Sequence, residues 1–566
     1  MAHEVEGPSL EYRRLRAPQD DFGLLVEPPW EGVAATVERN LHLGAFCRQR
    51  GDEACPGNAA CLVAGTPLVE LRELARRELL EAARRWTGSY RKLTEDGEAR
   101  GTGIQGRPGG DWVPLFLAGH QPQLIHPGVW FKNMALSHLA RLHGATAINL
   151  IIDSDTPKTT SIRVPTGVPG ALQTELVAFD RPGSGEAYEQ RRVLDEELFR
   201  SFGRRVSTAT AGLVDQPLIR EFWPEVVRRW EATGNAGAAV AQARHQCEAR
   251  YGGETLEVPQ SSVCETQAFR RFLAHLLEDL PRFRQIHNEV LHEYRRLHRL
   301  RNRAQPVPDL AADGDWLEAP LWMWSKTAPR RRRVFVRRDA AALTVSDRAG
   351  LEFSVPLHNP GSAVATLSEA ADRGVRLRSR ALVTTLWARL ALSDLFIHGI
   401  GGAKYDQLTD LLIARYFGRE VPGYLVVSAT LHLPLGTETA AVDDRRHLQQ
   451  QLRELDYHPE EHLDWHEIER AGVAGTVEEQ VELKRAWIAT EQTQENARRR
   501  CRGIRSVNAA LQPWVESRRR RLRELGRESE AALANRAVAT WREYAFCLYP
   551  AAILENFFEQ LLPKDD

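Results

Sequence analysis

The segment from Gly119 to Asn133 concentrates side chains that could do chemistry. It reads GHQPQLIHPGVWFKN and holds two histidines, two glycines and one lysine. The apolar run 113–118 before it predicts a short buried strand, and apolar residues at helical spacing over 129–142 predict a helix after it. The loop between a strand and a helix is where an α/β fold places its ligands. We therefore place a candidate site in this loop.

A second polar cluster follows the next predicted strand. Residues 145–152 form an apolar run that ends on two aspartates, and Gly144 closes the helix before it. Strand, helix and strand together predict one βαβ unit of a parallel sheet, with both clusters at the carboxyl ends of the strands. The candidate residues of the two clusters are His120, His126, Lys132, Asp153 and Asp155.

A glycine-rich loop later in the chain is a further candidate. Residues 398–406 read HGIGGAKYD, follow a short apolar strand at 394–397 and open a helix. Backbone N–H groups at a helix N-terminus bind anions, and Lys404 adds a positive charge. Gly401 and Gly402 therefore predict an anion cradle, although glycines also occur where a turn needs positive φ.

These residue types leave several chemistries open. His120, His126, Asp153 and Asp155 combine imidazole with carboxylate, which suits a metal-dependent hydrolase, but their spacing matches no known ligand signature. Alternatively, His126, Lys132 and the glycine loop stabilise nucleotide phosphates, while an aspartate holds a ribose, an amine or a metal ion. Each histidine or aspartate taken alone also fits a helix cap or a buried hydrogen bond.

Composition limits the class of protein. The chain has 566 residues, 75 basic and 76 acidic side chains and a net charge of −1, so neither nucleic acid nor an anionic membrane is indicated as a partner. No apolar run could span a bilayer and the first residues carry no signal-peptide core, so we expect a soluble, cytoplasmic protein. Seven scattered cysteines do not form a disulfide framework, and the spacing of Cys47, Cys55 and Cys61 does not favour zinc.

The length predicts two or three structural units. The α/β pattern is interrupted by a helix-rich tract and by strand-like runs with polar turns that predict a small antiparallel patch. We divide the chain into an N-terminal helical segment (1–110), a first part of the core (111–185), a helical insertion (186–310), a β patch (311–360), a second part of the core (361–440) and a C-terminal helical coiled coil (441–566).

The C-terminal third carries a seam of apolar residues at spacings of four and three, running from Ala497 to Leu525. Pro513 should kink or split it. An intramolecular helical hairpin and a dimerising coiled coil fit this pattern equally well. In the β patch, six arginines between Arg330 and Arg338 predict either a solvated basic hairpin or a phosphate or carboxylate site.

At these motifs the chain resembles the cysteine-adding enzyme family of bacillithiol biosynthesis. The family has a Gly-Gln-Gln loop followed by Gly-Pro and a helix with a lysine, to which Gly119, His120, Gln121, Gly128 and Lys132 are similar. It also has an arginine segment, a strand and Gly-Gly before a helix, similar to 378–380 and 400–405. His120 stands where the family carries glutamine, and the basic segment has no counterpart there.

The resemblance implies a Rossmann-like α/β core of the nucleotidyltransferase type and a C-terminal coiled coil that forms a homodimer. It implies an ATP-dependent ligase, with Mg²⁺, that joins cysteine to an amino sugar. His120, His126 and Lys132 would then steady phosphates, and Asp153 and Asp155 would contact the amine, ribose or Mg²⁺. Nucleotide contacts would come from Gly119, Gln121, Gly128, Gly401, Gly402 and Lys404. A nucleotide-binding protein without ligase chemistry is the remaining alternative.

Overall fold

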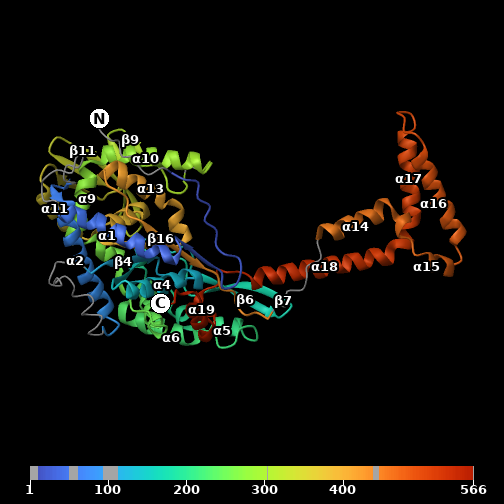
Figure 1. The fold of residues 1–566 in the computed structure, drawn as a ribbon, viewed down its shortest axis with the longest axis horizontal. Helices are drawn as coiled ribbons and strands as arrows, with labels where there is room; N and C mark the ends of the chain where they lie inside the picture. Colours follow the sequence, from blue (N-terminus) through green and yellow to red (C-terminus); the bar gives the residue numbers. More distant parts are fainter. Residues whose placement is uncertain (1–9, 50–61, 94–112, 303, 437–444, 565–566) are drawn as a thin grey trace. The chain divides into compact units, whose positions relative to one another are not determined.

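The structure is a computed structural model that describes residues 10–49, 62–93, 113–302, 304–436 and 445–564 (Figure 1). The chain divides into two compact units, each described by itself below. The first comprises 1–164, 176–433 and 542–566, and the second comprises 165–175 and 434–541. The first unit contains a mostly parallel sheet with helices, so the predicted α/β class is confirmed.

The main sheet has six strands in the spatial order β1-β16-β15-β4-β5-β8. All neighbours are parallel except β1, which pairs antiparallel with β16. If the five parallel strands are numbered 1 to 5 in the order in which they occur in the chain, their spatial order across the sheet is 3-2-1-4-5. The direction of winding therefore reverses between β4 and β15. The strands are β1 (Leu24–Glu27), β4 (Leu115–His120), β5 (Thr146–Ile151), β8 (Leu256–Pro259), β15 (Leu395–His398) and β16 (Tyr424–Ala429).

Side-chain alternation along β4 assigns its residues to two helical layers. Leu115 and Leu117 belong to a core cluster shared with α2 (Leu68–Gly88), α9 (Gln267–Glu278) and α12 (Ala381–Trp387). Phe116 points to the opposite face and packs on His143, at the end of α4 (Pro127–Leu142). His120 has the same parity as Phe116. It therefore points to the α4 face, whereas Gly119 faces the other layer.

A second, antiparallel sheet lies in the same unit, where strand-like runs predict a β patch. Its order is β13-β12-β11-β10-β14, and β14 brings in a segment beyond the predicted 311–360 range. The strands are β10 (Trp316–Ser325), β11 (Arg332–Arg338), β12 (Ala342–Ser346), β13 (Glu352–Pro356) and β14 (Val375–Ser379), with the short β9 (Ala312–Asp313) beside β10.

The tract 186–310, predicted as a helical insertion, contributes a strand to the main sheet. β8 pairs parallel with β5, so the tract is part of the core. The strand escaped prediction because it is four residues long and carries Glu257, whose buried carboxylate pairs with Arg244. The helices of the tract are α5 (Glu196–Ala209), α6 (Ile219–Thr233), α7 (Ala236–Arg250), α8 (Gln260–Cys264), α9 and α10 (Leu280–Leu297).

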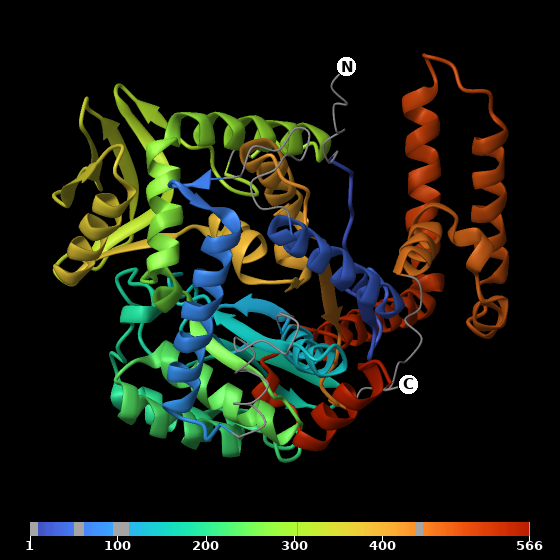
Figure 2. The same cartoon turned by 60° about the vertical axis from the view of Figure 1, so that its left-hand side comes forward.

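The remaining elements of the first unit frame these layers (Figure 2). The last helix packs on α4 through Phe558 and Trp130. No helix among the described residues has the length and apolar character needed to cross a membrane. The further elements are α1 (Val33–Gln49), β2 (Leu62–Val63), β3 (Thr66–Pro67), α11 (Pro360–Asp372), α13 (Ile400–Phe417) and α19 (Ala551–Leu561), and a hairpin of β6 (Ser161–Val168) and β7 (Ala171–Ala178) begins here.

Apart from the tip of the β6–β7 hairpin, the elements described in the second unit are helices. Figures 1 and 2 show α16 and α17 side by side, and α14 packs along α18. Pro513 lies in a 3-10 turn that separates α17 from α18, as predicted. Within the seam, Leu511, Val515 and Leu522 are buried inside the unit, but Cys501 is exposed, so the described packing is an intramolecular hairpin. The helices are α14 (Arg445–Tyr457), α15 (Trp465–Arg470), α16 (Ala474–Ala489), α17 (Ala497–Leu511) and α18 (Glu516–Ala539).

Candidate functional site

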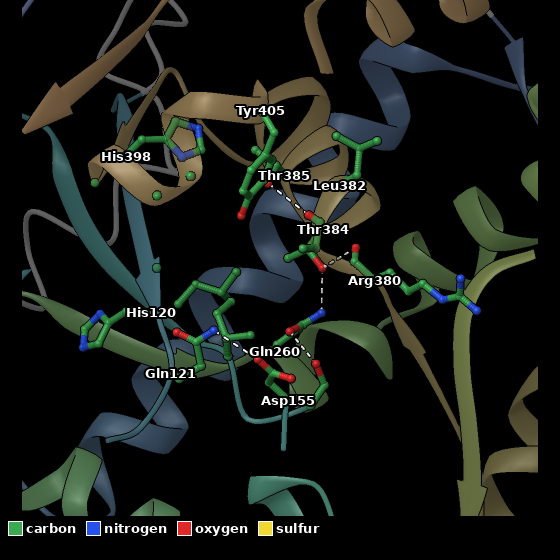
Figure 3. A pocket seen from close by; sticks show the side chains of 18 of the residues that line it. His120, Gln121, Asp155, Gln260, Arg380, Leu382, Thr384, Thr385, His398 and Tyr405 are labelled. Carbon is green, nitrogen blue, oxygen red and sulfur yellow. Dashed lines mark hydrogen bonds between the residues drawn. The ribbon is translucent and has the colours of Figure 1, made fainter. Parts of the chain in front are cut away.

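A cavity of about 650 Å³ opens at the carboxyl ends of β4 and β15, where the strand order reverses. This volume lies within the range of small-ligand pockets. Figure 3 shows His398 and Tyr405 on one side of it and Gln121, Asp155 and Gln260 on the other. The edge of the sheet predicted for ligand binding is therefore hollow, and it is lined by several of the predicted residues.

The end of β4 presents three predicted residues to the cavity in different ways. Gly119 contributes backbone, and Nε2 of Gln121 donates a 3.1 Å hydrogen bond to Oδ2 of Asp155. The His120 ring is 8% exposed, and Figure 3 shows it turned away from Gln121 and Asp155. Burial, with Arg244 and Lys132 adding, holds the His120 pKa well below its usual value. The ring is thus neutral, and its buried Nδ1 has no hydrogen-bond partner among the described residues.

Lys132 is a buried cation at the floor of the cavity. Only 2% of the residue is exposed, and Nζ donates a 2.9 Å hydrogen bond to the carbonyl oxygen of Gly119. Burial lowers its pKa to about 7, with Arg244 acting in the same direction and Glu248 opposing. The ammonium therefore gains or loses its proton near neutrality, and a bound anion would favour the charged form.

His126 and Gly128 serve the fold at the start of α4. Nδ1 of His126 accepts a 3.1 Å hydrogen bond from the Gly128 backbone N–H and caps the helix. Burial, with Arg542 adding, lowers the pKa of His126 to about 3, so its ring is neutral and cannot steady a phosphate as a cation. A Cβ on Gly128 would lie 1.9 Å from the carbonyl oxygen of Ala429. Gly128 does not line the cavity; it allows close packing of α4 on β16.

Asp155 lies in the cavity wall as part of an ion pair. One of its oxygens lies 3.0 Å from Nη1 of Arg331, which also donates to the carbonyl of Ser154. The guanidinium carbons of Arg331 and Arg380 lie 4.5 and 4.3 Å from the ring centroid of Trp322. The predicted basic segment therefore reaches the site through one residue, Arg331, while two arginines and a tryptophan form the wall opposite the glycine loop.

Asp153 lies outside the main cavity, contrary to its predicted role. Its carboxylate accepts hydrogen bonds from the hydroxyl and backbone N–H of Ser261, at 2.5 and 2.9 Å. It lines a separate hollow of about 270 Å³ together with Tyr188 and Glu189. Burial raises the pKa of Asp153 to about 7, and the charge of Glu189 adds to the shift. Asp153 and Asp155 lie in the turn after β5, where the alternation of a strand no longer holds, so their side chains diverge.

The glycine loop forms the start of α13 as predicted. Gly399 is the N-cap residue, no side chain in the described part of the chain caps the helix, and Gly401 and Gly402 line the cavity. The first backbone N–H groups of the helix thus have no side-chain acceptor. Lys404, predicted to join this cradle, is exposed and does not line the cavity. It lies two residues after Gly402 and therefore on another side of the helix, because a helix rotates by about 100° per residue.

The site also contains groups that the sequence analysis did not assign. Nε2 of His398 lies 2.9 Å from Oδ2 of Asp406, which pairs with Arg389 at 2.6 Å. On the opposite wall, Nε2 of Gln260 donates to the Thr384 hydroxyl at 2.7 Å. His398 could have been found as the last residue of a buried strand before a glycine loop. Gln260 had no such signal, since the strand that ends just before it was missed.

No protein-family model matches this chain, and no curated protein matches it.

The predicted metal set does not assemble. His126 caps a helix, and Asp153 accepts hydrogen bonds from Ser261. In the described structure, the ligand atoms of His120, His126, Asp153 and Asp155 do not lie close enough together to hold one metal ion. Among the residues that the structure describes, the one group of such atoms within reach of a common ion is His458, Glu460 and Glu461, in the second unit. Cys55 and Cys61 lie outside the described residues. The geometry thus gives no support to the metal-hydrolase alternative.

Proposed function

We propose that the protein is an ATP-dependent ligase that forms a carbon–nitrogen bond between cysteine, or another amino acid, and an amino-sugar acceptor. One observation carries this proposal: the cavity at the point of strand reversal combines a buried lysine with an uncapped, glycine-rich helix start. Open α/β sheets bind nucleotides at this place. The 3-2-1-4-5 strand order supports a Rossmann-like core of the nucleotidyltransferase type.

The nucleotide side of the cavity is the side of β4, α4 and α13. The backbone N–H groups at Gly401 and Gly402 suit phosphate oxygens, and Lys132 supplies the positive charge. The unpartnered Nδ1 of His120 is a buried polar atom near this floor. ATP would supply the phosphate-containing leaving group that makes a carboxyl carbon reactive toward an amine.

The substrate side is the wall formed by Trp322, Arg331 and Arg380. Guanidinium groups bind carboxylates, and the tryptophan face suits a sugar ring or an aliphatic stem. Gln260 and Thr384 add hydrogen-bonding groups next to this wall. These side chains suit substrates that carry both a carboxylate and hydroxyl groups, as amino acids and acidic amino sugars do.

A protein-held Mg²⁺ does not fit this site. Asp155 is paired with Arg331, and Asp153 accepts hydrogen bonds from Ser261 in another hollow. Neither carboxylate is available as a ligand that faces the phosphate side. A magnesium ion would therefore have to arrive on the phosphates of ATP.

The homodimer belongs to the same proposal, and it rests on the family resemblance. Leu483 and Ile488 on α16 are 45% and 48% exposed in the second unit, so this helix offers apolar side chains to a partner. Sedimentation of the full chain should give twice its mass. Charged substitutions at both positions should then yield the monomer, whereas a monomeric parent chain would refute the dimer.

Nucleotide turnover separates the ligase from a nucleotide-binding protein. Purified protein is incubated with ATP, Mg²⁺ and each amino acid in turn, and AMP and ADP are quantified while ATP binding is measured by calorimetry. Amino-acid-dependent turnover is expected. Binding without turnover under any amino acid would favour the binding protein, and neither binding nor turnover would overturn the nucleotide site.

His120→Ala adds a second test of the same distinction. If His120 acts on the phosphates, the variant should lose turnover but keep most of its nucleotide affinity. An unchanged rate would assign the ring to the packing between β4 and α4, in agreement with its neutral, buried state.

A further inference from the structure

His398 links the cavity to a fully buried ion pair. It is the last residue of β15 and lines the cavity, while Asp406 lies in the second turn of α13 and is 0% exposed. Oδ2 of Asp406 lies 2.9 Å from Nε2 of His398 and 2.6 Å from Nη1 of Arg389. Arg389 also pairs with Asp410 at 2.7 Å. A histidine at the cavity thus rests on a carboxylate that is itself held in place by an arginine.

The bond to Asp406 decides which ring nitrogen carries the proton. Burial by itself would raise the pKa of Asp406, but Arg389 and His398 hold it below its usual value, so the group is a carboxylate. A carboxylate only accepts hydrogen bonds, and Nε2 must therefore be the donor. In the neutral ring this leaves the lone pair on Nδ1.

Nδ1 has room to act because residue 402 is glycine. A Cβ at Gly402 would lie 2.7 Å from Nδ1. The described residues donate no hydrogen bond to this nitrogen. The Phe396 and Tyr424 rings, at centroid distances of 4.6 and 5.2 Å, hold the imidazole in place. An orienting carboxylate, a fixed ring and a free lone pair at a cavity are the parts of a general base.

Other charged and titratable groups surround the dyad. α13 presents Asp406, Asp410 and Tyr405, the π turn after α12 presents Arg389, and β16 presents Tyr424. Lys132 and His120 line the same cavity from α4 and β4. Among these, Asp406 is the carboxylate that His398 contacts, so Asp406 has the strongest electrostatic effect on the imidazole.

We propose that His398 is the general base of the joining step and that Asp406 is its positioning residue. This inference rests on the proposed ligase function. The acceptor reaches the site after its ammonium has lost one proton to water. Its nitrogen lone pair forms the C–N bond with the activated carboxyl carbon. The bond from that carbon to the phosphate oxygen breaks with its electron pair, and Nδ1 takes the second proton from the nitrogen.

Hydroxylamine tests the base separately from carboxyl activation. As a weakly basic nucleophile it is unprotonated at neutral pH, so its attack depends less on a base than attack by an ordinary amine does. His398→Gln should lower kcat with the amino-sugar acceptor by about 10²- to 10⁴-fold. The same variant should still convert cysteine and ATP to the hydroxamate at close to the wild-type rate.

Asp406→Asn and Asp410→Asn form a matched pair. Both remove a carboxylate from Arg389, but only Asp406 contacts His398. Without the anion the protonated ring is less stable, so in Asp406→Asn the acid limb of the kcat profile should move about one pH unit or more downward. Asp410→Asn should keep the wild-type profile.

The outcomes separate this inference from the proposed function. If the wild-type enzyme forms neither the amide nor the hydroxamate, the ligase proposal is overturned, and the proposed base with it. If His398→Gln is correctly folded by circular dichroism and its hydroxamate formation falls as far as its amide formation, the role of His398 as general base is overturned, but the ligase proposal is not. Identical pH profiles for the two aspartate variants overturn the role of Asp406.

Discussion

Nζ of Lys132 donates a 2.9 Å hydrogen bond to the carbonyl oxygen of Gly119, and this contact ties α4 to the end of β4. The ammonium is buried, and its pKa is lowered to about 7. The Lys132 side chain is therefore mostly protonated below about pH 7 and mostly uncharged above it. Anion binding at the cavity should therefore depend on pH in a way that identifies this residue.

Nucleotide affinity should fall as the pH rises above 7. The protonated lysine attracts phosphate. At pH values where Lys132 of the free enzyme is deprotonated, nucleotide binding should therefore be accompanied by the uptake of a proton. Calorimetry in two buffers of different ionisation enthalpy should detect this uptake. Lys132→Met should bind ATP more weakly and without the pH dependence, while Lys404→Met should match the wild type. A wild-type affinity that does not change with pH would remove Lys132 from the phosphate site.

His126 should make the fold sensitive to acid. Its pKa is about 3 in the folded chain against 6.5 for the unfolded residue, so the unfolded chain binds the proton more tightly. Stability that is present above pH 6.5 is therefore lost as the pH falls toward 3. Asn is a good N-cap residue. His126→Asn should flatten this part of the stability curve in urea unfolding, and equally steep curves for both proteins would contradict the assignment.

Alanine should be far more costly at Gly128 than at Gly399. A Cβ at 128 would overlap the Ala429 carbonyl oxygen, whereas nothing lies within 4 Å of one at 399. We expect Gly128→Ala to lower the free energy of unfolding by about 1–3 kcal/mol or more. Gly399→Ala should cost about 0.5 kcal/mol or less, because its φ of −85° suits any residue and only the preference of the N-cap for glycine over alanine is lost. Equal unfolding free energies for the two variants would refute the close packing.

Two tryptophans on β10 allow a matched test of the substrate wall. Trp322 stacks with Arg331 in the cavity, and Trp316 stacks with Arg337 outside it, with the guanidinium carbon 4.9 Å from the ring centroid. Trp322→Leu should raise KM for the substrate bound there by about tenfold, the loss of roughly 1–2 kcal/mol of contact. Trp316→Leu should leave KM unchanged. Similar KM values in both variants would place substrate elsewhere.

Much of the fold followed from patterns in the chain. Buried strands such as β4 and β5 are continuous apolar runs bounded by polar residues, and these give a strong signal. β8 was missed because a buried Arg244–Glu257 pair replaces part of the apolar pattern. The two residues of this pair are 13 positions apart in the chain, and only the folded sheet brings their charges together.

The candidate site was predicted by place more than by residue. A cavity lies at the predicted edge of the sheet, since that edge depends only on where strands end, but the directions of single side chains depend on parity and capping. His126 and Asp153 have partners at Gly128 and Ser261 that no spacing rule reveals. The His398–Asp406 pair was overlooked because an imidazole and a carboxylate eight positions apart form no known motif.

The most direct test of the ligase is mass spectrometry of a reaction that contains the purified protein, ATP, Mg²⁺, cysteine and glucosaminyl-malate. A ligase of this kind should give a product heavier than the acceptor by one cysteinyl unit, formed together with AMP or ADP in equal amount. Absence of this product, with no nucleotide consumed either here or when other amino acids replace cysteine, would contradict the ligase proposal.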